Sequence, residues 1–590
     1  MEINCGQADE SYIGKPVELK GWCRYLRDHG GKLFIDLADR YGLTQLVFDG
    51  DALADAKQIG KEYAICVSGR VRRRDDETID RGNPTGMVEI YATKVAVINK
   101  SELPPFEVID EKRKFLANEE LRLRYRYLDL RRREMIGNIE FRDRVTKETR
   151  RFFWDNDFLE LETPMLVKDT YETGSRTFLV PSRVNHGRFY SLPQSPQVYK
   201  QMAMISGLDR YFQMARCFRD EDPREDRQPE FMQIDFEACF RDEKWAQELI
   251  ERLMKRLFRE AMKKELKTPF KRMDYRYAME NYGSDKPDLR FGSRIFDVTG
   301  EAGKSSYNIL KRVVESGGKA KAMAFPAGFG SADQKLDRNY MLKAIETAKS
   351  LGLKGLTWLF VRDGRINSDP GSIASSLGGA AEGIMEKLNP GDGDIIILCS
   401  DPSERLLLDA MGKLRKMIGD RIGLYTAEFE FLWVDGFPLF ETDEVTGKLK
   451  PAHNPFSSPT EPTLELLDTA PEKVSSRQFD LVLNGVELGS GSVRIRDAAL
   501  QRKILNMIGM TDEAVDKTFG FLLEALKYGA PDSVGMGLGF DRIVAMMRNT
   551  KDIREFILFP KNKKQELPID GSPTQISGQR LDEDYGIKTG

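Results

Sequence analysis

The first hundred positions alternate short apolar runs with turn residues. Five runs have the length and composition of β-strands, and they cover residues 17–22, 33–37, 44–48, 63–71 and 87–98. Residues 51–59, between the third and fourth runs, are compatible with a helix. Five short strands with one helix in that place predict an OB-fold, a small β-barrel that binds oligonucleotides on one face.

Longer helical and strand-like patterns follow the barrel. Apolar residues at Ile139, Val145 and Phe152 predict a helix over 136–156, and residues 157–164 resemble a strand that stops at a proline. Further strand-like runs cover residues 211–218, 230–240, 357–361, 394–399 and 429–434. The mixture predicts an α+β chain of several domains.

At 590 residues the chain is too long for one hydrophobic core. A linker begins near Pro104 and Pro105, and glycine-rich turns alternate with helical runs and short strands after residue 288. The expected parts are a barrel (1–103), a hinge (104–134), the first half of a core (135–288), an inserted α/β module (289–424), the second half of the core (425–560) and a polar C-terminal extension (561–590).

Charge and cysteine usage narrow the functional classes. The net charge of −3 argues against a general polyanion binder, although basic runs at 70–74 and 112–133 fit either solvated helix faces or a local nucleic-acid surface. Six scattered cysteines and three histidines offer no zinc cluster and predict reduced, mostly buried thiols. The longest apolar runs are far short of a membrane span, and the polar N-terminus resembles no targeting signal, so we expect a cytoplasmic protein with no membrane contact.

The strongest chemical signal lies in residues 210–237, RYFQMARCFRDEDPREDRQPEFMQIDFE. Arg219 directly follows the first strand of this stretch. The second strand places Phe231, Gln233, Asp235 and Glu237 on one face. Because unpaired buried charge is costly, this polar face predicts a polar ligand.

This stretch resembles motif 2 of the class II aminoacyl-tRNA synthetases. Residues 535–542, GMGLGFDR, resemble motif 3 at the start of an apolar helix, and residues 136–164 resemble motif 1. Glycines let a backbone approach a ligand, and an arginine supplies a fixed cation. The three motifs occur in the family's order, so the resemblance implies a class II catalytic core built on an antiparallel sheet, with motif 1 at a homodimer interface.

The resemblance implies an ATP site without a Walker loop, and the sequence contains no GxxxxGK[ST] motif. Arg219 would hold the α-phosphate, while Phe231 and Arg542 would cover the two faces of adenine. The remaining implied contacts to ATP are Glu221, Arg227, Gln228 and Glu487. Asp480 and Glu487 would hold Mg²⁺, a hard ion that suits carboxylates. Arg219, Arg542 and Glu487 are thus the implied catalytic residues, and no general base is needed because the substrate carboxylate is already ionised.

Two further elements resemble the aspartyl-tRNA synthetases of the bacterial type. They are Ser195-Pro196-Gln197-Val198-Tyr199-Lys200 and residues 487–494, ELGSGSVR. The resemblance implies that Lys200 and Arg494 bind the side-chain carboxylate of L-aspartate and that Asp235 meets its ammonium group. Ser195, Gln197, Arg219, Gln233 and His453 complete the implied aspartate site. The inserted module resembles the GAD domain of the same family.

Three positions depart from the family pattern. Residues 173–176 read TGSR, with Glu172 one place early, where the family commonly has Glu-Gly-Ala-Arg. Asn454 replaces the second histidine of a pair, and Asp532 stands in place of another histidine. These departures weaken the expectation for substrate closure but leave Arg219, Lys200, Arg494 and Arg542 in place.

In the barrel, four residues match the family's readers of the tRNA anticodon. Phe34 would stack on the central base, Gln45 would read its edge, and Glu89 would face the first base. Taken alone, Phe34 fits a barrel core equally well. His29 lies in the expected loop 27–31; at this place histidine accompanies enzymes that charge both tRNA(Asp) and tRNA(Asn), although an exposed loop histidine is an equal alternative.

These observations predict an aspartate–tRNA ligase that uses ATP with Mg²⁺ and forms a homodimer. An asparaginyl-tRNA synthetase is the alternative within the same class. A paralogue that binds RNA or ATP without aminoacylation is the alternative outside it, since a fold does not fix a function.

Overall fold

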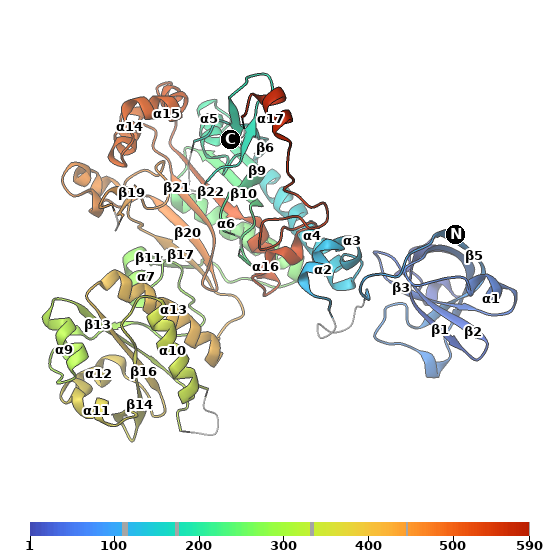
Figure 1. Ribbon diagram of the computed structural model, residues 1–590, viewed down its shortest axis with the longest axis horizontal. Coiled ribbons are helices and arrows are strands. Elements are labelled where there is room, and N and C mark those ends of the chain that lie inside the picture. Colours follow the sequence, from blue (N-terminus) through green and yellow to red (C-terminus); the bar gives the residue numbers. More distant parts are fainter. Residues whose placement is uncertain (109–115, 171–175, 223, 331–334, 444–445, 589–590) are drawn as a thin grey trace. The chain divides into compact units, whose positions relative to one another are not determined.

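The computed structural model describes residues 1–108, 116–170, 176–222, 224–330, 335–443 and 446–588 (Figure 1). The chain divides into two compact units, which are described separately. Unit 1 comprises residues 1–144, 223–228 and 552–576; unit 2 comprises residues 145–222, 229–551 and 577–590.

Unit 1 contains a closed five-stranded barrel in the order β1-β2-β3-β5-β4. Its elements are η1 (Glu10–Tyr12), β1 (Pro16–His29), β2 (Lys32–Ala38), β3 (Leu43–Phe48), α1 (Gly50–Ala56), β4 (Ala64–Arg73), η2 (Asp76–Thr78) and β5 (Val88–Asn99). The interior is aliphatic, with Val17, Leu19, Ile35, Leu37 and Val67 among its buried residues. The predicted OB-fold is confirmed.

Strand β1 is longer than its apolar run predicts. It continues past residue 22 through a register shift between Cys23 and Tyr25 and ends at His29, opposite Lys32. The turn to β2 is therefore only Gly30-Gly31, whose φ angles of 61° and 77° suit glycine in a tight hairpin. The prediction of a loop over 27–31 is wrong for its first three residues, which are paired strand.

The hinge uses much of its positive charge internally. Short helices α2 (Glu119–Arg124) and α3 (Arg126–Asp129) precede α4 (Arg133–Trp154). Asp129 is fully buried and accepts hydrogen bonds from Arg122, Arg126 and Arg132 at 2.7–3.2 Å. Part of the basic run 112–133 is thus an internal ion-pair cluster. For this part, both sequence interpretations, a solvated helix face and a nucleic-acid surface, are wrong.

The same hinge binds a segment that is remote in sequence. Arg126 donates to the carbonyl groups of Arg554, Ile557 and Leu558, in and beyond η7 (Ile553–Phe556). These contacts bring residues 552–576 into unit 1.

Unit 2 is built on an eight-stranded sheet in the order β11-β17-β20-β21-β22-β10-β9-β6. The strands are β6 (Leu159–Glu160), β9 (Arg210–Phe218), β10 (Glu230–Cys239), β11 (Lys271–Asp274), β17 (Phe431–Asp435), β20 (Gln478–Leu483), β21 (Val486–Val493) and β22 (Ser533–Gly539). All neighbours pair antiparallel except the two edge pairs, β11 with β17 and β6 with β9. The predicted antiparallel core is confirmed.

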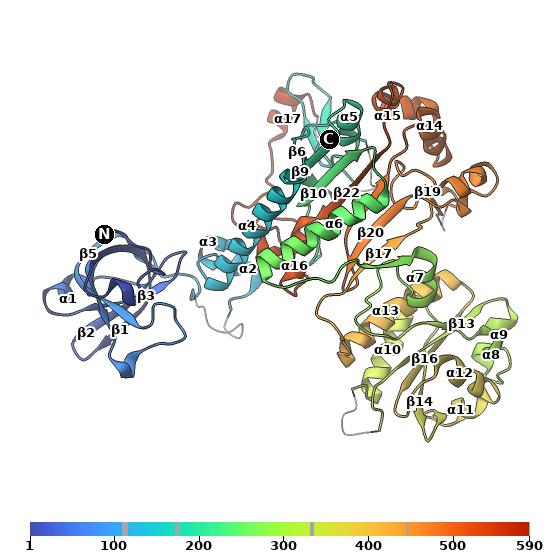
Figure 2. The same cartoon turned by 180° about the vertical axis from the view of Figure 1, so that it is seen from behind.

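One face of this sheet is covered by helices. α6 (Glu243–Leu257) and α16 (Phe540–Met547) cross it (Figure 2), and Phe153 of α4 stacks on Phe212 at 4.7 Å. Phe236 of β10 packs against Phe153 and Phe158 on this side. Side chains alternate along a strand, so Asp235 and Glu237 point to the opposite face.

The strand predicted over 157–164 is reduced to Leu159 and Glu160. Asp157 takes a left-handed conformation with φ 61° before it. After it, the backbone of Thr163 donates to the side chain of Gln213 rather than to a strand, and Pro164 has no N–H to donate.

Smaller elements complete the core. They are β7 (Leu179–Pro181), β8 (Phe189–Ser191), α5 (Gln197–Ile205), the π-helical turn η4 (Phe258–Met262), α7 (Tyr275–Tyr282), β18 (Phe440–Thr442), β19 (Leu449–Pro451), η5 (Glu461–Asp468), η6 (Pro471–Lys473), α14 (Ala498–Met507), α15 (Asp512–Leu526) and α17 (Gly578–Tyr585). No helix in the described part of the chain is long and apolar enough to cross a membrane.

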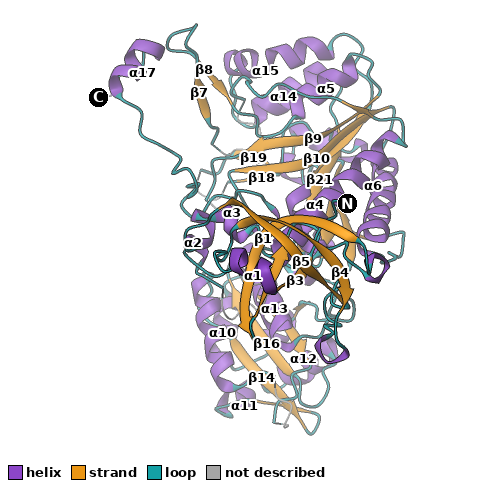
Figure 3. Cartoon of the chain, turned by 90° about the vertical axis from the view of Figure 1, so that its right-hand side faces the viewer, coloured by secondary structure: helices purple, strands orange, loops and turns teal. Residues whose placement is uncertain are grey.

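The inserted module is a five-stranded antiparallel sheet with helices on both faces (Figure 3). Its strands, in sheet order, are β12 (Phe296–Asp297), β13 (Lys319–Phe325), β16 (Ile395–Asp401), β14 (Thr357–Arg362) and β15 (Arg365–Asn367). α10 (Arg338–Ser350) and α13 (Glu404–Ile422) pack on one face; α8 (Thr299–Ala302), α9 (Asn308–Glu315), α11 (Ser372–Leu377) and α12 (Ala380–Leu388) pack on the other.

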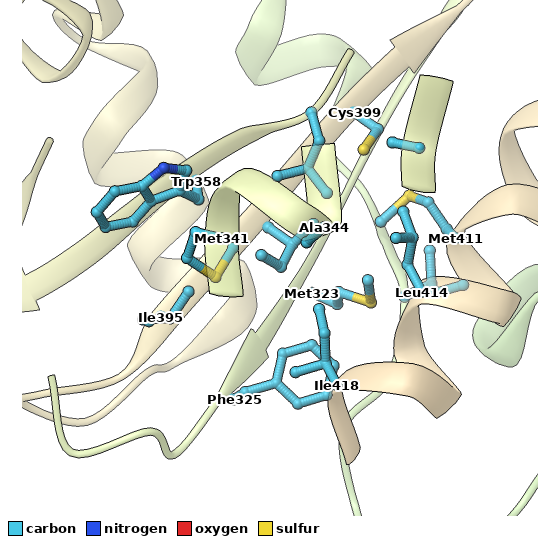
Figure 4. Packing of buried hydrophobic residues seen from close by; sticks show 14 of the residues in the cluster. Met323, Phe325, Met341, Ala344, Trp358, Ile395, Cys399, Met411, Leu414 and Ile418 are labelled. Atoms are coloured by element: carbon cyan, nitrogen blue, oxygen red, sulfur yellow. The ribbon is translucent and has the colours of Figure 1, made fainter. Parts of the chain in front are cut away.

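Burial on both faces explains the unbroken apolar run of β16. Ile395 and Cys399 point into the core formed with Met341 and Leu414 (Figure 4), whereas Ile396 points into the second core on the far side of the sheet. A strand covered on both faces has no polar face, so its sequence shows no alternation.

Candidate active site

The polar face of the β9–β10 hairpin lies beside a strand of glycines. In the register of β10 with β22, Gln233 is opposite Gly539, Asp235 opposite Gly537 and Glu237 opposite Gly535. A Cβ atom at Gly535 would lie 1.8 Å from Oε2 of Glu237. The glycines of the motif 3 resemblance therefore leave the space that a buried carboxylate occupies.

Four buried charges form the centre of this face. Lys200 of α5 lies 2.8 Å from Oδ2 of Asp235 and 3.5 Å from Oε2 of Glu237. Nε and Nη2 of Arg494 donate to the two oxygens of Glu237 at 2.8 and 3.0 Å, and Nη1 donates to the Ser492 hydroxyl at 2.6 Å. All four charged side chains are at most 5% exposed. Two cations and two anions are thus held together away from water.

Several polar atoms of this site have no partner in the described part of the chain. They are Oδ1 of Asp235, Nε2 of Gln197 and Nε of Arg219, each of them buried. Burial raises the pKa of Asp235, and the Lys200 ammonium opposes that rise. Because an unsatisfied buried polar atom is costly, these atoms are suited to a ligand that hydrogen-bonds to them.

Arg219 and Phe231 face each other across the hairpin. The backbone N–H of Arg219 donates to the carbonyl of Pro229 at 2.9 Å, and the guanidinium lies 5.2 Å from the centre of the Phe231 ring. Arg542, at the start of α16, donates from Nη1 to the backbone carbonyl of Glu487 at 2.6 Å. The bond to the Glu487 carbonyl holds the guanidinium of Arg542 in place, whereas the guanidinium of Arg219 contacts the Phe231 ring.

A second carboxylate pair lies on the hairpin of β20 and β21. Asp480 is buried, and its Oδ2 lies 3.6 Å from Nε2 of His453; Oε2 of Glu487 lies 3.5 Å from Nζ of Lys286. Burial lowers the pKa of His453, but the carboxylates around it, Asp480 foremost, together raise the pKa to about 9. For Glu487, burial raises the pKa, and the positive charges of Lys286, His453 and Arg542 together more than offset this, so the pKa is lowered.

The pair fits a metal that takes further ligands from its substrate. Both side chains offer oxygen donors, which Mg²⁺ prefers, and Mg²⁺ completes its shell with water and phosphate oxygens. Within the described residues, no group of three or more His, Cys, Asp or Glu side chains is placed to hold a metal. Asp480 and Glu487 would therefore supply two ligands rather than a complete cage.

In the barrel, an ion-pair network covers the outer face of all five strands. Arg27 makes a bidentate pair with Asp36 at 2.7 and 2.8 Å and donates to Gln45 at 3.2 Å. Gln45 in turn donates to Glu89 at 2.8 Å, and Arg72 donates to the other oxygen of Glu89 at 2.8 Å.

The other two predicted anticodon residues lie on the same outer side. Phe34 is half-buried and is not part of the barrel core, in which its neighbours Leu33 and Ile35 pack. The alternative that Phe34 is a core residue is therefore wrong. His29 is exposed at the end of β1.

Comparisons with known proteins show the family to which the chain belongs. The family model described as tRNA synthetases class II (D, K and N) matches residues 118–563, and the model of the OB-fold nucleic acid binding domain matches residues 17–98. The chain belongs to the class II tRNA synthetases.

Relatives of this synthetase match nearly its whole length. It is 43% identical to the aspartate–tRNA(Asp/Asn) ligase of Treponema denticola, with 98% of each chain covered. It is 42% identical to the aspartate–tRNA ligase of Bacillus licheniformis, with 98% of this chain and 97% of the relative covered. Among solved structures, the asparaginyl-tRNA synthetase of Entamoeba histolytica with asparaginyl-adenylate has a TM-score of 0.59 at 17% identity, over 95% of this chain and 98% of that one. At that identity the likeness shows the fold alone.

The synthetase contains functional candidates that sequence reasoning missed. Glu237 was placed on the polar face without a role, yet it binds both Lys200 and Arg494. Lys286 belongs to no motif in the sequence, and Asp541 accepts a hydrogen bond from the Met232 backbone at 2.7 Å. A sequence gives the face of a strand but not the partner across the sheet.

The other residues predicted to bind ATP or aspartate make the following contacts. Ser195 accepts from the Gln197 backbone at 3.3 Å, and Gln233 accepts from Cys217 at 3.4 Å. Glu221 is half-buried in unit 2. Arg227 and Gln228 belong to unit 1, where Gln228 exchanges hydrogen bonds of 2.8 and 3.2 Å with the Lys561 backbone.

Of the departures from the family pattern, Glu172, Thr173, Gly174 and Ser175 lie outside the described residues. Asn454 accepts hydrogen bonds from the backbone of Phe456 at 3.0 Å and from the Ser457 hydroxyl at 3.3 Å, so it fixes a turn. Asp532 pairs with Arg496 at 2.6 Å.

Proposed function

We propose that the chain is an aspartate–tRNA ligase, which activates L-aspartate with ATP and transfers it to tRNA. The buried group of Lys200, Asp235, Glu237 and Arg494 carries the proposal. Relatives that match nearly the whole chain and bear the name aspartate–tRNA ligase support it. The enzyme would work in the cytoplasm, where tRNA is charged.

Charge balance within the group suits aspartate. Glu237 takes up one positive charge by binding Arg494 and lying close to Lys200, and Asp235 has a free oxygen for an ammonium group. With the ammonium group on Asp235, one positive charge is left for a side-chain carboxylate. Three N–H groups of Arg494 are used by Glu237 and Ser492, and a guanidinium has five.

Asparagine fits the same group poorly. Its amide is neutral, so the second cation would be buried without an anion, and its NH₂ donors would face N–H donors of Lys200 and Arg494. Sites built for one pattern of polar groups reject a mismatched pattern strongly. This argument favours aspartate over the asparaginyl alternative.

ATP would bind across the same sheet. Arg219 would neutralise the α-phosphate that the α-carboxylate of aspartate attacks, and Phe231, Glu221 and Arg542 would hold the nucleotide. Asp480 and Glu487 would bind Mg²⁺, which when present screens phosphate charge. Two anions must meet in this reaction, so fixed cations and alignment supply the catalysis.

ATP–pyrophosphate exchange tests the amino acid. We expect exchange with aspartate and none with asparagine. Arg494→Leu should lower kcat/KM for aspartate at least about a hundredfold, because it removes a charge-assisted bidentate partner of the ligand. Arg496→Leu is the matched control, since Arg496 is 59% exposed and pairs with Asp532. Exchange with asparagine alone would support the asparaginyl alternative, and no exchange at all would leave a binding paralogue.

We propose further that both tRNA(Asp) and tRNA(Asn) are charged. Relatives of both kinds, named for one or for both tRNAs, match at similar identity, so the choice rests on His29. Its exposed imidazole has a donor and an acceptor and tolerates either pyrimidine at the base that distinguishes the two anticodons.

Charging of purified transcripts tests this choice. His29→Leu should lower charging of tRNA(Asn) at least about tenfold and spare tRNA(Asp), since one base contact contributes about 1–3 kcal/mol. Lys32→Leu, across the hairpin from His29, is the control. A wild-type enzyme that charges tRNA(Asn) thousands of times less efficiently than tRNA(Asp) would refute the proposal.

A further inference from the structure

Lys286 is a cation at the edge of the proposed magnesium site. Its Nζ lies 3.5 Å from Oε2 of Glu487 and 3.4 Å from Oδ2 of Asp285. The side chain is 42% exposed, so it has room to move when another cation approaches. Of the two carboxylates proposed to hold Mg²⁺, Asp480 faces His453 and Glu487 faces Lys286.

The segment that carries Lys286 is held by the inserted module. Arg415 of α13 is 2% exposed and donates to the backbone carbonyls of Asp288, Phe291 and Ser293. Lys416 of the same helix lies 3.2 Å from the Asp288 carboxylate.

The backbones of the two elements also touch. A Cβ atom at Gly412 of α13 would lie 2.0 Å from the carbonyl oxygen of Gly283, and one at Gly283 would lie 2.1 Å from the carbonyl oxygen of Leu408. Such close approach needs glycine on both sides. Residues 283–293 are therefore fixed to α13 by side chains and main chain together.

The other side of this segment touches the metal-binding hairpin. Gly485 forms the turn between β20, which carries Asp480, and β21, which carries Glu487. A Cβ atom at Gly485 would lie 2.9 Å from Cβ of Asp288. Asp288 thus lies between the inserted module and the turn that joins the two carboxylate strands.

We propose that Lys286 is a built-in counter-cation of the Asp480–Glu487 pair and that the inserted module holds it there. The proposal rests on the proposed function, because it takes this pair as the magnesium site. A divalent cation that arrives without nucleotide meets the Lys286 charge, and like charges repel. The phosphates of ATP bring enough negative charge to accommodate both cations. Lys286 therefore makes metal binding depend on the nucleotide, and it is a positioning residue.

Mn²⁺ binding to the nucleotide-free, full-length enzyme tests the proposal. Free Mn²⁺ is measured by electron paramagnetic resonance, and Glu487→Gln identifies the signal of this site by abolishing it. Lys286→Met should bind Mn²⁺ about tenfold more tightly than wild type, the size expected for one partly screened charge. Lys286→Arg should bind as wild type does. Lys413→Met is the control, because Lys413 lies on α13 and pairs only with its helix neighbour Asp409 among the contacts described.

A double-mutant cycle tests the role of the inserted module. Asp288→Asn removes the carboxylate that Arg290 and Lys416 hold, so it should loosen Lys286 and tighten Mn²⁺ binding about threefold. In the Lys286→Met background it should have no further effect. Equal effects in both backgrounds would show that Asp288 does not act through Lys286.

The outcomes separate the two proposals. If wild type catalyses aspartate-dependent exchange but Lys286→Met binds Mn²⁺ within twofold of wild type, the counter-cation proposal is wrong and the proposed function stands. If Lys286→Met is poorly folded by circular dichroism, Lys286→Gln replaces it under the same criterion. If wild type shows no exchange, the proposed function fails whatever the Mn²⁺ result.

Discussion

Glu237 is the residue on which the proposed aspartate site depends most. It is fully buried and lies in contact with two cations, and the glycine at position 535 leaves it room. A carboxylate of this kind keeps Lys200 and Arg494 in place while the site has no ligand. It also spares the two buried cations from having only the Asp235 carboxylate as their anion.

Glu237→Gln should therefore destabilise the free enzyme by about 3–5 kcal/mol, because two buried cations would share one anion. Saturating aspartate should restore more stability to the variant than to wild type, since the ligand brings the missing negative charge. Differential scanning fluorimetry with and without aspartate measures both effects. Glu230→Gln, at the more open end of the same strand, is the control. Equal melting temperatures for Glu237→Gln and wild type would contradict the role assigned to Glu237.

At this scale the sequence predicted residue types better than contacts. The motif resemblance pointed to Lys200, Asp235 and Arg494, and the structure brings all three into one buried group with Glu237. The sequence did not indicate that Glu237 binds the cations. The alternation of side chains along a strand shows which face a residue lies on but not which residue lies opposite. Lys286 lies in a turn between helix and strand, where no periodicity exists to interpret.

Among the elements, the first barrel hairpin shows where the pattern of apolar residues fails to predict the end of a strand. The apolar run ends at residue 22, yet β1 continues to His29 because its polar residues find partners within the barrel: Arg24 pairs with Glu62 at 2.6 Å and Arg27 pairs with Asp36. Ion pairs replace apolar contacts along this extension. Strands of the inserted module were easier to predict, because burial on both faces leaves unbroken apolar runs.

Two glycine-to-alanine substitutions, one in the Gly30-Gly31 turn and one in a helix, should change local stability in opposite directions. Gly31 has φ 77°, so Gly31→Ala should destabilise the hairpin by about 1 kcal/mol. Gly137 lies within α4 with open space around its Cα, so Gly137→Ala should stabilise that helix by about 0.5–1 kcal/mol. Hydrogen exchange of the amides in each element, followed by mass spectrometry, measures both changes. Faster exchange at Gly137→Ala, or slower exchange at Gly31→Ala, would refute the backbone argument.

Across the whole molecule, contacts between distant segments were the least predictable feature. Unit 1 gathers three stretches of sequence, and Arg126 holds carbonyl groups more than four hundred positions away. The hinge arginines looked like surface charge because sequence gives no sign of the single buried Asp129 that they share. The class II core was predictable because motifs 2 and 3 each combine an arginine with a strand or a run of glycines, and these patterns can be recognised in the sequence itself.

Assembly is the property of the whole molecule that the surface itself indicates. Around the motif 1 strand, large apolar side chains are exposed: Leu159 by 50%, Leu166 by 52%, Leu179 by 55%, Val184 by 80% and Phe189 by 46%. The segment after β6 is joined to the β7–β8 hairpin by a bridge between Val167 and Ser191, so these side chains lie on connected elements. A soluble monomer rarely exposes so much apolar surface in one region.

We therefore expect a homodimer with this region at its two-fold axis, the commonest symmetry of soluble assemblies. Multi-angle light scattering at micromolar concentration should give twice the chain mass of 67.3 kDa. Leu166→Asp combined with Phe189→Asp should shift the equilibrium to monomer, because a charge buried at an apolar interface has no partner. Leu464→Asp, at a side chain exposed by 40% on η5, is the control and should remain dimeric. A wild-type monomer at this concentration would contradict the dimer. A double variant that dimerises as wild type does would place the interface elsewhere. In either case the exposed apolar region would need another partner.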